Sequence, residues 1–248
     1  MEQNNINVSI QTNKHTLYKG DCLEVMKDIP NESVDLVVTD PPYKITARGN
    51  GGNSGGMFQK KEVNSGKVFK NNDIDISDWI NDIYRILKPQ SHCYIMTNNK
   101  NIYHYLDIIN NKSEFNYIKN LIWVKDNKIM GQTYMSQFEY IIMLRKGAHR
   151  KINNCGVSDV LNFKNKKSKN EEGKTIHDTE KPVGLLKVLV ENSSNENDII
   201  FDPFAGLFSL TEACIDTNRE FIGCELDDSY FNIGKKRIAD ILEKGELK

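Results

Sequence analysis

A run of apolar, mostly β-branched residues in this chain ends at two consecutive prolines. Residues 34–39 read Val-Asp-Leu-Val-Val-Thr, and Asp40-Pro41-Pro42-Tyr43 follows. Such a run is typical of a buried parallel strand. The prolines end the strand because each lacks an N–H donor and fixes φ at about −65°. The sequence therefore predicts an α/β fold with a rigid bend after a strand, where the ligands of open α/β sheets bind.

The groups on this bend suit the exocyclic amino group of a nucleobase. The Asp40 carboxylate and the Pro41 carbonyl are adjacent acceptors for the two N–H donors of an amino group. Pro42 keeps the bend rigid, and Tyr43 offers a ring on which a base can stack, typically worth about 1–3 kcal/mol. An ordinary strand-terminating turn is the alternative interpretation of these four residues alone.

Composition and length describe a water-soluble protein. The 248 residues are 38% hydrophobic and can form a single domain over residues 1–248. No run approaches the roughly 18 apolar residues of a membrane span. The polar start at Met1 lacks a signal peptide's apolar stretch, so we expect a cytoplasmic protein. The five cysteines are scattered and indicate neither a disulfide framework nor a metal site.

Two segments differ in composition from the rest of the chain. Residues 44–72 are rich in Gly, Asn and Ser, which predicts a mobile loop beside Asp40. A flexible linker without a function would have the same composition and is the alternative. Residues 145–174 carry nine Lys or Arg against three Asp or Glu, in a protein of net charge −1. This basic segment predicts a contact with a polyanion, and a solvated surface insertion is the alternative.

The remaining pattern predicts alternating strands and helices. Strands are expected at 15–19, 92–97, 198–201 and 220–224, a helical turn at 23–26, and helices at 77–87, 182–191, 209–217 and from 227 onward. Residues 117–124 and 138–144 predict two strands with no convincing helix between them. We expect them to form an antiparallel hairpin at one edge of a mostly parallel, doubly wound sheet.

A second ligand-binding half follows near the C-terminus. The strand at 198–201 leads into Asp202-Pro203-Phe204-Ala205-Gly206, and the strand at 220–224 ends at Glu225. A glycine in the turn lets a ligand approach the backbone, and an acidic residue about 20 positions further on suits a ribose.

Together these blocks resemble the amino-methylating, S-adenosylmethionine-dependent DNA methyltransferases of the circularly permuted β type. The resemblance covers nearly the whole chain and implies a Rossmann-like class I methyltransferase fold. Six blocks carry it: Gly20-Asp21-Cys22-Leu23, Arg85-Ile86-Leu87-Lys88-Pro89, Phe138-Glu139-Tyr140-Ile141-Ile142, His177-Asp178-Thr179-Glu180-Lys181-Pro182, Asp202-Pro203-Phe204-Ala205-Gly206 and Gly223-Cys224-Glu225-Leu226-Asp227.

The resemblance also implies roles for individual residues. Asp40, Pro41, Pro42 and Tyr43 would form the catalytic site, and no metal would be needed. Asp21 would meet the adenine ring of the S-adenosylmethionine cofactor, although it could simply cap the turn after Gly20. The remaining cofactor contacts would be Thr179 and Lys181 at the carboxylate, Asp202 at the amino group, Phe204, Ala205 and Gly206 along the methionine moiety, and Glu225 at the ribose.

The implied substrate is double-stranded DNA with the target base flipped out of the stack. Lys44 and Arg48 would hold phosphates beside the site. Residues 146–176, with Arg150 and Lys151, occupy the position of the family's target-recognition region. Aspartate at the first tetrapeptide position resembles the N6-adenine methylators, because N4-cytosine members usually carry serine there. A homodimer and a cognate restriction endonuclease are conceivable further partners.

One departure from the family pattern bears on cofactor binding. The turn continues Gly206-Leu207-Phe208-Ser209, whereas family members usually have a second glycine here. Phe208 would then place a bulky ring where a ligand should approach the backbone. Because of this turn, one alternative is a catalytically inactive DNA-binding homologue. N4-cytosine methylation is the other alternative, which concerns the choice of base and not the turn.

Overall fold

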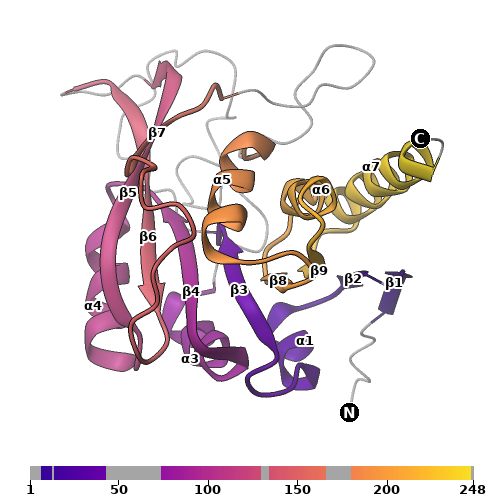
Figure 1. Ribbon diagram of the computed structural model, residues 1–248, viewed down its shortest axis with the longest axis horizontal. Coiled ribbons are helices and arrows are strands. Elements are labelled where there is room, and N and C mark those ends of the chain that lie inside the picture. Colours follow the sequence, from indigo (N-terminus) through magenta and orange to yellow (C-terminus); the bar gives the residue numbers. More distant parts are fainter. Residues whose placement is uncertain (1–6, 13, 43–73, 130–133, 166–179, 247–248) are drawn as a thin grey trace, which may run out of the picture.

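The computed structural model describes residues 7–12, 14–42, 74–129, 134–165 and 180–246. These residues build a nine-stranded sheet in the order β1-β2-β9-β8-β3-β4-β6-β5-β7, with helices on both faces (Figure 1). The strands are β1 Asn7–Gln11, β2 His15–Lys19, β3 Val34–Thr39, β4 Leu87–Thr97, β5 Asn116–Ile129, β6 Ser136–Arg145, β7 Val160–Asn162, β8 Ile199–Asp202 and β9 Glu220–Glu225.

The centre of the sheet is parallel and its flanks are mixed. Neighbouring strands from β2 through β9, β8 and β3 to β4 all run in the same direction. β6 is antiparallel to both β4 and β5, as expected of the predicted hairpin. The hairpin does not form the edge, however, because the short strand β7 pairs parallel to β5 outside it. At the other edge, β1 pairs antiparallel to β2.

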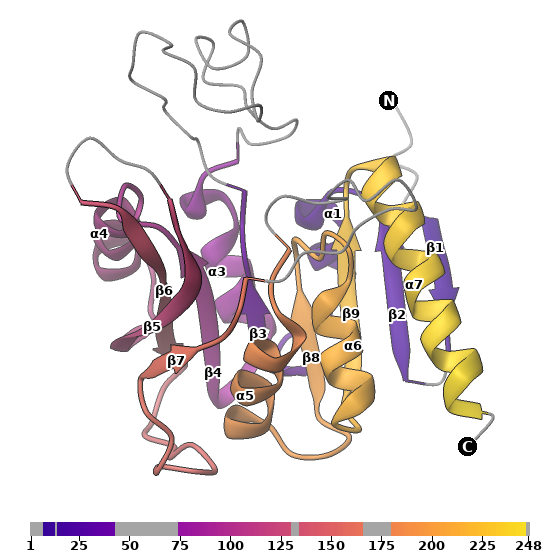
Figure 2. The ribbon, with the colours of Figure 1, turned by 90° about the horizontal axis from the view of Figure 1, so that it is seen from above.

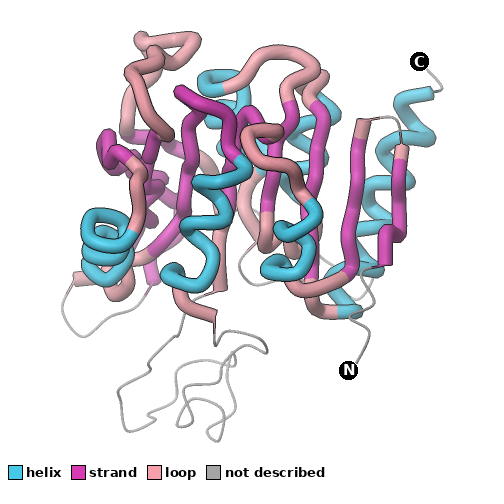
Figure 3. The backbone as a smooth tube through the Cα atoms, turned by 90° about the horizontal axis from the view of Figure 1, so that it is seen from below, coloured by secondary structure: helices cyan, strands magenta, loops and turns pink. Residues whose placement is uncertain are grey.

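Two layers of helices cover the sheet, as a doubly wound fold requires (Figures 2 and 3). One face carries α1 and α3, which lie with α4 over a core that includes Trp79 and Phe201. The other face carries α5, α6 and α7 over a core that includes Phe208 and Phe221. The helices are α1 Cys22–Asp28, α3 Ile76–Ile86, α4 Ile102–Lys112, α5 Val183–Ser193, α6 Ser209–Asp216 and α7 Asp228–Glu246.

Local sequence accounts for most element boundaries. Asp75 caps α3 and forms a reciprocal capping box with Asp78, so this helix begins one residue before its predicted start. α5 begins at Val183 with Pro182 as its N-cap, one residue after the predicted start. None of the described helices is long and apolar enough to cross a membrane.

Three elements were not predicted, and one strand begins earlier than expected. The three are β1, α4 and β7. β4 starts at Leu87, directly after α3, and passes through Pro89 with Gln90 at a φ of 68°. The sequence predicted this strand only from residue 92, and an irregularity in the β3–β4 pairing accommodates Pro89 in the earlier part of the strand.

The chain changes direction between β3 and β8. From β3 it continues through α3 to β4 on one side, and from β8 it continues through α6 to β9 on the other. Ligands of open α/β sheets bind at such a switch point, outside the carboxyl ends of the strands. Asp40 and Asp202 follow or end the two strands that flank this point, so the fold places both acids there.

Candidate active site

Four acidic residues lie at the carboxyl ends of four neighbouring parallel strands. Asp202 ends β8 and Glu225 ends β9. Asp40 directly follows β3, and Asp21 lies two residues beyond β2. Because β2, β9, β8 and β3 are adjacent in this order, the two sequence motifs meet at one edge of the sheet, which we call the carboxyl edge.

The two carboxylate oxygens of Asp40 have different surroundings. Oδ2 accepts a hydrogen bond from the Lys181 ammonium group. Oδ1 is buried and has no hydrogen-bond partner among the described residues. Burial raises the pKa of Asp40 above its ordinary value, although the Lys181 charge opposes the shift. A buried acceptor without a partner is costly, typically about 1–3 kcal/mol, so Oδ1 is the atom expected to receive a ligand's donor.

Lys181 lies where the sequence did not predict it. The resemblance implied a contact with the cofactor's carboxylate, whereas in the structure Lys181 is paired with Asp40 and lies 3.5 Å from Glu139 Oε2. Its side chain is only 7% exposed, so this is not a solvated lysine at the start of a helix. Pro182 caps the following helix and fixes where Lys181 enters the site.

Asp202 is a buried carboxylate beside Asp40. Its Oδ1 accepts hydrogen bonds from Thr39 Oγ1 at 2.8 Å and from the Phe204 backbone N–H at 3.0 Å. Burial raises the pKa of Asp202 to about 7, despite these two hydrogen bonds. Among the described residues no Lys or Arg side chain forms an ion pair with it. A cationic group brought in by a ligand would therefore find an acceptor that the protein leaves uncompensated.

Glu225 and the turn after β8 are held together. Glu225 Oε2 accepts the Gly206 N–H at 2.9 Å, and Oε1 accepts the Asp227 N–H at 2.7 Å. Gly206 has a φ of 55°, a conformation that glycine adopts without strain. Burial raises the pKa of Glu225, and each oxygen retains a second lone pair. The two carboxylate oxygens can therefore accept hydrogen bonds from two ribose hydroxyls.

Asp21, Phe204 and Ala205 complete this half of the edge. Asp21 is exposed and caps α1, its carboxylate accepting the Leu23 N–H at 2.9 Å. Phe204 is half-buried and meets Trp79 edge to face at 5.6 Å, and the Ala205 N–H donates to the Cys224 carbonyl. The structure thus brings Asp21, Phe204, Ala205, Gly206, Asp202 and Glu225 to one side of Asp40.

Phe208 does not point at this edge. The sequence placed its ring in the path of a ligand, and that expectation was wrong. Phe208 has a φ of 56° as the N-cap of α6, and this left-handed conformation turns its side chain into the core, where it is fully buried. The ring packs edge to face against Phe221 and Phe231 and lies over Gly234 of α7.

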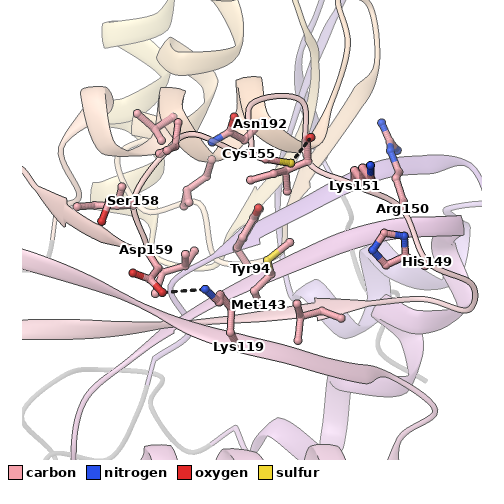
Figure 4. A pocket seen from close by; sticks show the side chains of 17 residues that line it. Tyr94, Lys119, Met143, His149, Arg150, Lys151, Cys155, Ser158, Asp159 and Asn192 are labelled. Carbon is pink, nitrogen blue, oxygen red and sulfur yellow. Dashed lines mark hydrogen bonds and ion pairs between the residues drawn. The ribbon is translucent and has the colours of Figure 1, made fainter.

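Several predicted site residues lie elsewhere. Arg150 and Lys151 belong to the loop that follows β6, and Arg150 lies beside His92 at the amino end of β4. They line a pocket between this loop, β5 and α5, on the opposite edge of the sheet from Asp40 (Figure 4). Tyr43, Lys44, Arg48 and Thr179 lie outside the described residues.

The site also contains two residues to which the sequence analysis assigned no role. Lys125 and Glu139 form a buried ion pair that adjoins Lys181, beside the ring of Trp123. A signal exists in the sequence, because Trp123 and Lys125 share one face of a strand and Lys125 is a charge at the end of an apolar run. Within the described ranges, no cluster of three or more His, Cys, Asp or Glu side chains is arranged to hold a metal ion.

The amino-acid sequence is similar to a protein-family model and to methyltransferases of two bacteria. The profile of a family described as DNA methylase matches residues 34–236. The chain is 30% identical to the type II methyltransferase M.HinfI of Haemophilus influenzae, over 92% of this chain and 69% of that protein. It is 29% identical to the DNA adenine methyltransferase YhdJ of Escherichia coli, over 90% of this chain and 82% of that protein.

Solved structures share the fold. M1.HpyAVI in complex with SAM (S-adenosylmethionine) superposes with a TM-score of 0.66 at 24% identity, covering 90% of this chain and 99% of that one. The cytosine-N4-specific PvuII DNA methyltransferase superposes with a TM-score of 0.74 at 15% identity, covering 97% of this chain and 95% of that one. At these identities the similarity concerns the class I methyltransferase fold.

Proposed function

Because the chain belongs to the DNA methylase family, whose methyl donor is S-adenosylmethionine, we propose that it methylates the N6 amino group of a flipped adenine in double-stranded DNA. The protein is a DNA methyltransferase, and the proposal concerns which base it modifies and which residues act. The observation that carries it is the buried, unpartnered Asp40 Oδ1 at the switch point of the sheet.

Asp40 and Pro41 act on the amino group directly. The lone pair of a base amino nitrogen is delocalised into the ring, which makes this nitrogen a poor nucleophile. When Asp40 Oδ1 and the Pro41 carbonyl accept its two N–H bonds, the nitrogen becomes more tetrahedral and its lone pair can point at the methyl group. The nitrogen would form a bond to the methyl carbon while the donor's carbon–sulfur bond breaks, with the electron pair of that bond going to sulfur. One N–H proton would then pass to solvent. Catalysis then rests on positioning and on stabilising the positive charge that develops on nitrogen.

The other half of the edge holds the cofactor, which supplies an electrophilic methyl group when bound. We assign Glu225 to the ribose hydroxyls, Asp202 to the cationic amino group and Asp21 to the adenine ring. The Phe204–Gly206 turn passes along the methionine moiety, and Thr179 is proposed at the carboxylate. Support comes from the lone pairs that remain on Glu225 and from the uncompensated burial of Asp202.

Adenine is favoured over cytosine by the first residue of the tetrapeptide. Aspartate at position 40 resembles the N6-adenine methylators, and a relative at 29% identity is named a DNA adenine methyltransferase. The cytosine-N4-specific neighbour shares the fold at only 15% identity. N4-cytosine methylation is the second candidate because that neighbour has the same sheet.

We propose further that the chain order is the permuted β type, with the catalytic strand before the cofactor half. Tyr43 would stack on the flipped base, with Pro42 keeping the bend rigid, and Lys44 and Arg48 would contact phosphates. Residues 146–176 would form the target-recognition region, although Arg150 and Lys151 within it lie at the opposite edge of the sheet and are not proposed as DNA contacts. A restriction–modification setting with a companion endonuclease is suggested by relatives named type II methyltransferases, and a homodimer is a further proposal.

Mass spectrometry of the modified DNA tests the choice of base. The protein is incubated with S-adenosylmethionine and unmethylated genomic DNA, and the digested nucleosides are analysed. We expect N6-methyladenine. N4-methylcytosine in its place would overturn the choice of adenine.

Asp40→Asn tests the assignment of the catalytic carboxylate. The variant removes the negative charge at nearly constant volume. We expect methyl transfer to fall on the order of 10²–10³-fold, as when one charge-stabilising group is removed from an active site. Cofactor binding, followed by calorimetry, should persist because Asp40 is not assigned to the cofactor. A variant that methylates at the wild-type rate would contradict the assignment.

A further inference from the structure

Two lysines and two carboxylates alternate in a buried row at the carboxyl edge. The Lys125 ammonium group donates to Glu139 Oε1, and the Lys181 ammonium group lies 3.5 Å from Glu139 Oε2. Lys181 also donates to Asp40 Oδ2, so Glu139 and Asp40 share it. The two lysine side chains are 6% and 7% exposed. The order of the row is therefore Lys125, Glu139, Lys181, Asp40, and its net charge is zero.

The row is built on three different parts of the fold. Lys125 belongs to β5 and Glu139 to β6, where Glu139 pairs directly with Trp123. Lys181 comes from the segment before α5, and Asp40 follows β3. The buried Trp123 ring lies below both ammonium groups, 4.8 Å from Lys125 Nζ and 6.0 Å from Lys181 Nζ.

Trp123 is itself held in place. Its indole Nε1–H donates to the Phe163 carbonyl at 2.9 Å, just beyond β7. Ammonium groups over an indole face are stabilised by the ring's electron density. The hairpin of β5 and β6 therefore presents a fixed ion pair to Lys181, and Lys181 presents a fixed charge to Asp40.

A buried row of alternating charges couples its members. Removing one partner from a buried ion pair leaves the other uncompensated, which is strongly unfavourable. Asp40 and Glu139 repel each other across Lys181, and burial makes both carboxylates harder to ionise. The two lysines outweigh this effect at Glu139 and lower its pKa. The ionisation of Asp40 therefore depends on how many positive and negative charges the row contains.

We propose that Lys125 and Glu139 are positioning residues for Asp40, which act by holding Lys181 against Oδ2 so that Oδ1 is left to the amino group of the base. The inference rests on the proposed function, because it needs Asp40 to be the catalytic carboxylate. Lys125 and Glu139 do not touch the base themselves. They fix which oxygen of Asp40 is engaged and keep the carboxylate charged.

The test changes the charge of the row in both directions and then restores it. Glu139→Gln leaves the row with a net charge of +1, and Lys125→Gln leaves it with −1. The double variant K125Q/E139Q is neutral again and pairs two amides in place of two charges. Methyl-transfer rates are measured against pH in single turnovers, with saturating S-adenosylmethionine and unmethylated DNA.

We expect the acidic limb of the rate profile to move in opposite directions. In Glu139→Gln the extra positive charge favours ionised Asp40, so the limb moves to lower pH by about one unit. In Lys125→Gln the unbalanced carboxylates hold one proton more tightly, so the limb moves to higher pH by about one unit. In the double variant the limb returns toward its wild-type position. A loss of packing alone would not move the limb in opposite directions.

Two further variants separate charge from structure. Lys125→Arg keeps the charge and should leave the limb in place even if the rate falls. Lys88→Gln breaks a more exposed lysine–carboxylate ion pair, in which Lys88 Nζ lies 2.7 Å from Asp35 Oδ1 near the opposite end of β3. This variant should leave the whole profile unchanged. If Glu139→Gln does not fold, as judged by urea unfolding, the comparison of Lys125→Gln with Lys125→Arg decides.

The outcomes distinguish this inference from the proposed function. If Asp40→Asn methylates DNA at the wild-type rate, the proposed site is wrong. If Asp40→Asn is inactive while Lys125→Gln and Lys125→Arg have their limbs at the same pH, the proposed site stands and the positioning role is overturned. Activity lost in both single variants and not recovered in the double variant would also overturn it.

Discussion

At the scale of single residues, the carboxylates of the site differ in whether a Lys or Arg side chain neutralises their charge. Lys181 neutralises Asp40, whereas Asp202 and Glu225 form no ion pair with Lys or Arg among the described residues. Both are buried enough for their pKa values to rise. An edge with two uncompensated carboxylates favours a ligand that brings positive charge, and a sulfonium cofactor with an ammonium group does so.

Asp202 should make the stability of the protein fall as pH rises toward neutrality. Burial raises its pKa in the folded state to about 7, above the ordinary value near 3.9. The folded state therefore binds the proton more tightly than the unfolded state. The stabilisation is complete below about pH 4 and is lost as pH rises through about 7.

Urea unfolding between pH 5 and pH 8 checks this sign. We expect the free energy of unfolding of the wild type to fall across this range, and that of Asp202→Asn to fall less. The variant should therefore gain stability relative to the wild type as pH rises. Parallel curves for the two proteins would show that Asp202 titrates normally in the folded state.

At the scale of elements, the start of α6 decides how the cofactor turn is supported. Phe208 takes up a left-handed conformation that costs a non-glycine residue about 1–2 kcal/mol. Its ring is then buried against Phe221 and Phe231, and full burial contributes about 1.5–3 kcal/mol, which offsets that cost. Phe208, which replaces the family's glycine, thus strengthens the contact between α6 and α7. Its side chain does not occupy the side of the turn that faces the ligand.

Gly234→Ala tests the contact between α6 and α7. In an exposed helix interior this change normally stabilises by about 1 kcal/mol. Here an added Cβ would lie 2.4 Å from Phe208 Cδ2, so we expect a loss of about 1–3 kcal/mol in the free energy of unfolding. In a Phe208→Ala background the same change should cost less, although the Leu207 backbone at 3.1 Å remains close. Urea unfolding of the four proteins gives the coupling energy, and a stabilised Gly234→Ala in the wild-type background would contradict the packing.

The accuracy of the sequence prediction differs between elements for physical reasons. The β3 strand and α3 carry strong patterns, namely an apolar run stopped by prolines and apolar residues at helical spacing, and both were confirmed within one residue. α4 was missed because it has no side-chain cap at its start and buries only three residues, Tyr105, Ile108 and Ile109. β7 has three residues with only Leu161 buried, too few to show a period.

The same reasoning explains which site residues the sequence revealed. Asp40, Asp202 and Glu225 stand directly at the ends of recognisable strands, so their meeting at one edge follows from the fold alone. The Lys181–Asp40 contact joins residues 141 positions apart and depends on how α5 packs, which no local pattern encodes. The direction of the Phe208 ring depends on one backbone φ angle, which the residue type does not fix.

At the scale of the whole molecule, Asp40 and the cations of the loop after β6 lie at opposite edges of the sheet. Asp40 lies at the carboxyl edge, and Arg150 lies beside His92 at the amino end of β4. The five residue-to-residue steps of β4 from His92 to Thr97 span roughly 17 Å. DNA that presents a flipped base to Asp40 must approach the carboxyl edge. Lys128 at the end of β5 and Lys164 after β7 are exposed on that side.

The salt dependence of DNA binding distinguishes these two groups of cations. Each phosphate contact contributes a slope of about −0.9 to the logarithm of affinity against the logarithm of salt concentration. We expect Lys128→Ala with Lys164→Ala to reduce the slope by up to about two, because both lysines lie on the side that DNA approaches.

Arg150→Ala with Lys151→Ala should leave the slope unchanged, since these residues line a pocket at the other edge. Affinity is measured by fluorescence anisotropy on one duplex from 50 to 200 mM salt, with Lys88→Ala as a single-charge control at the amino end. A reduced slope in the Arg150 and Lys151 variant would show that these residues contact DNA, as the sequence predicted. DNA would then have to reach both edges of the sheet.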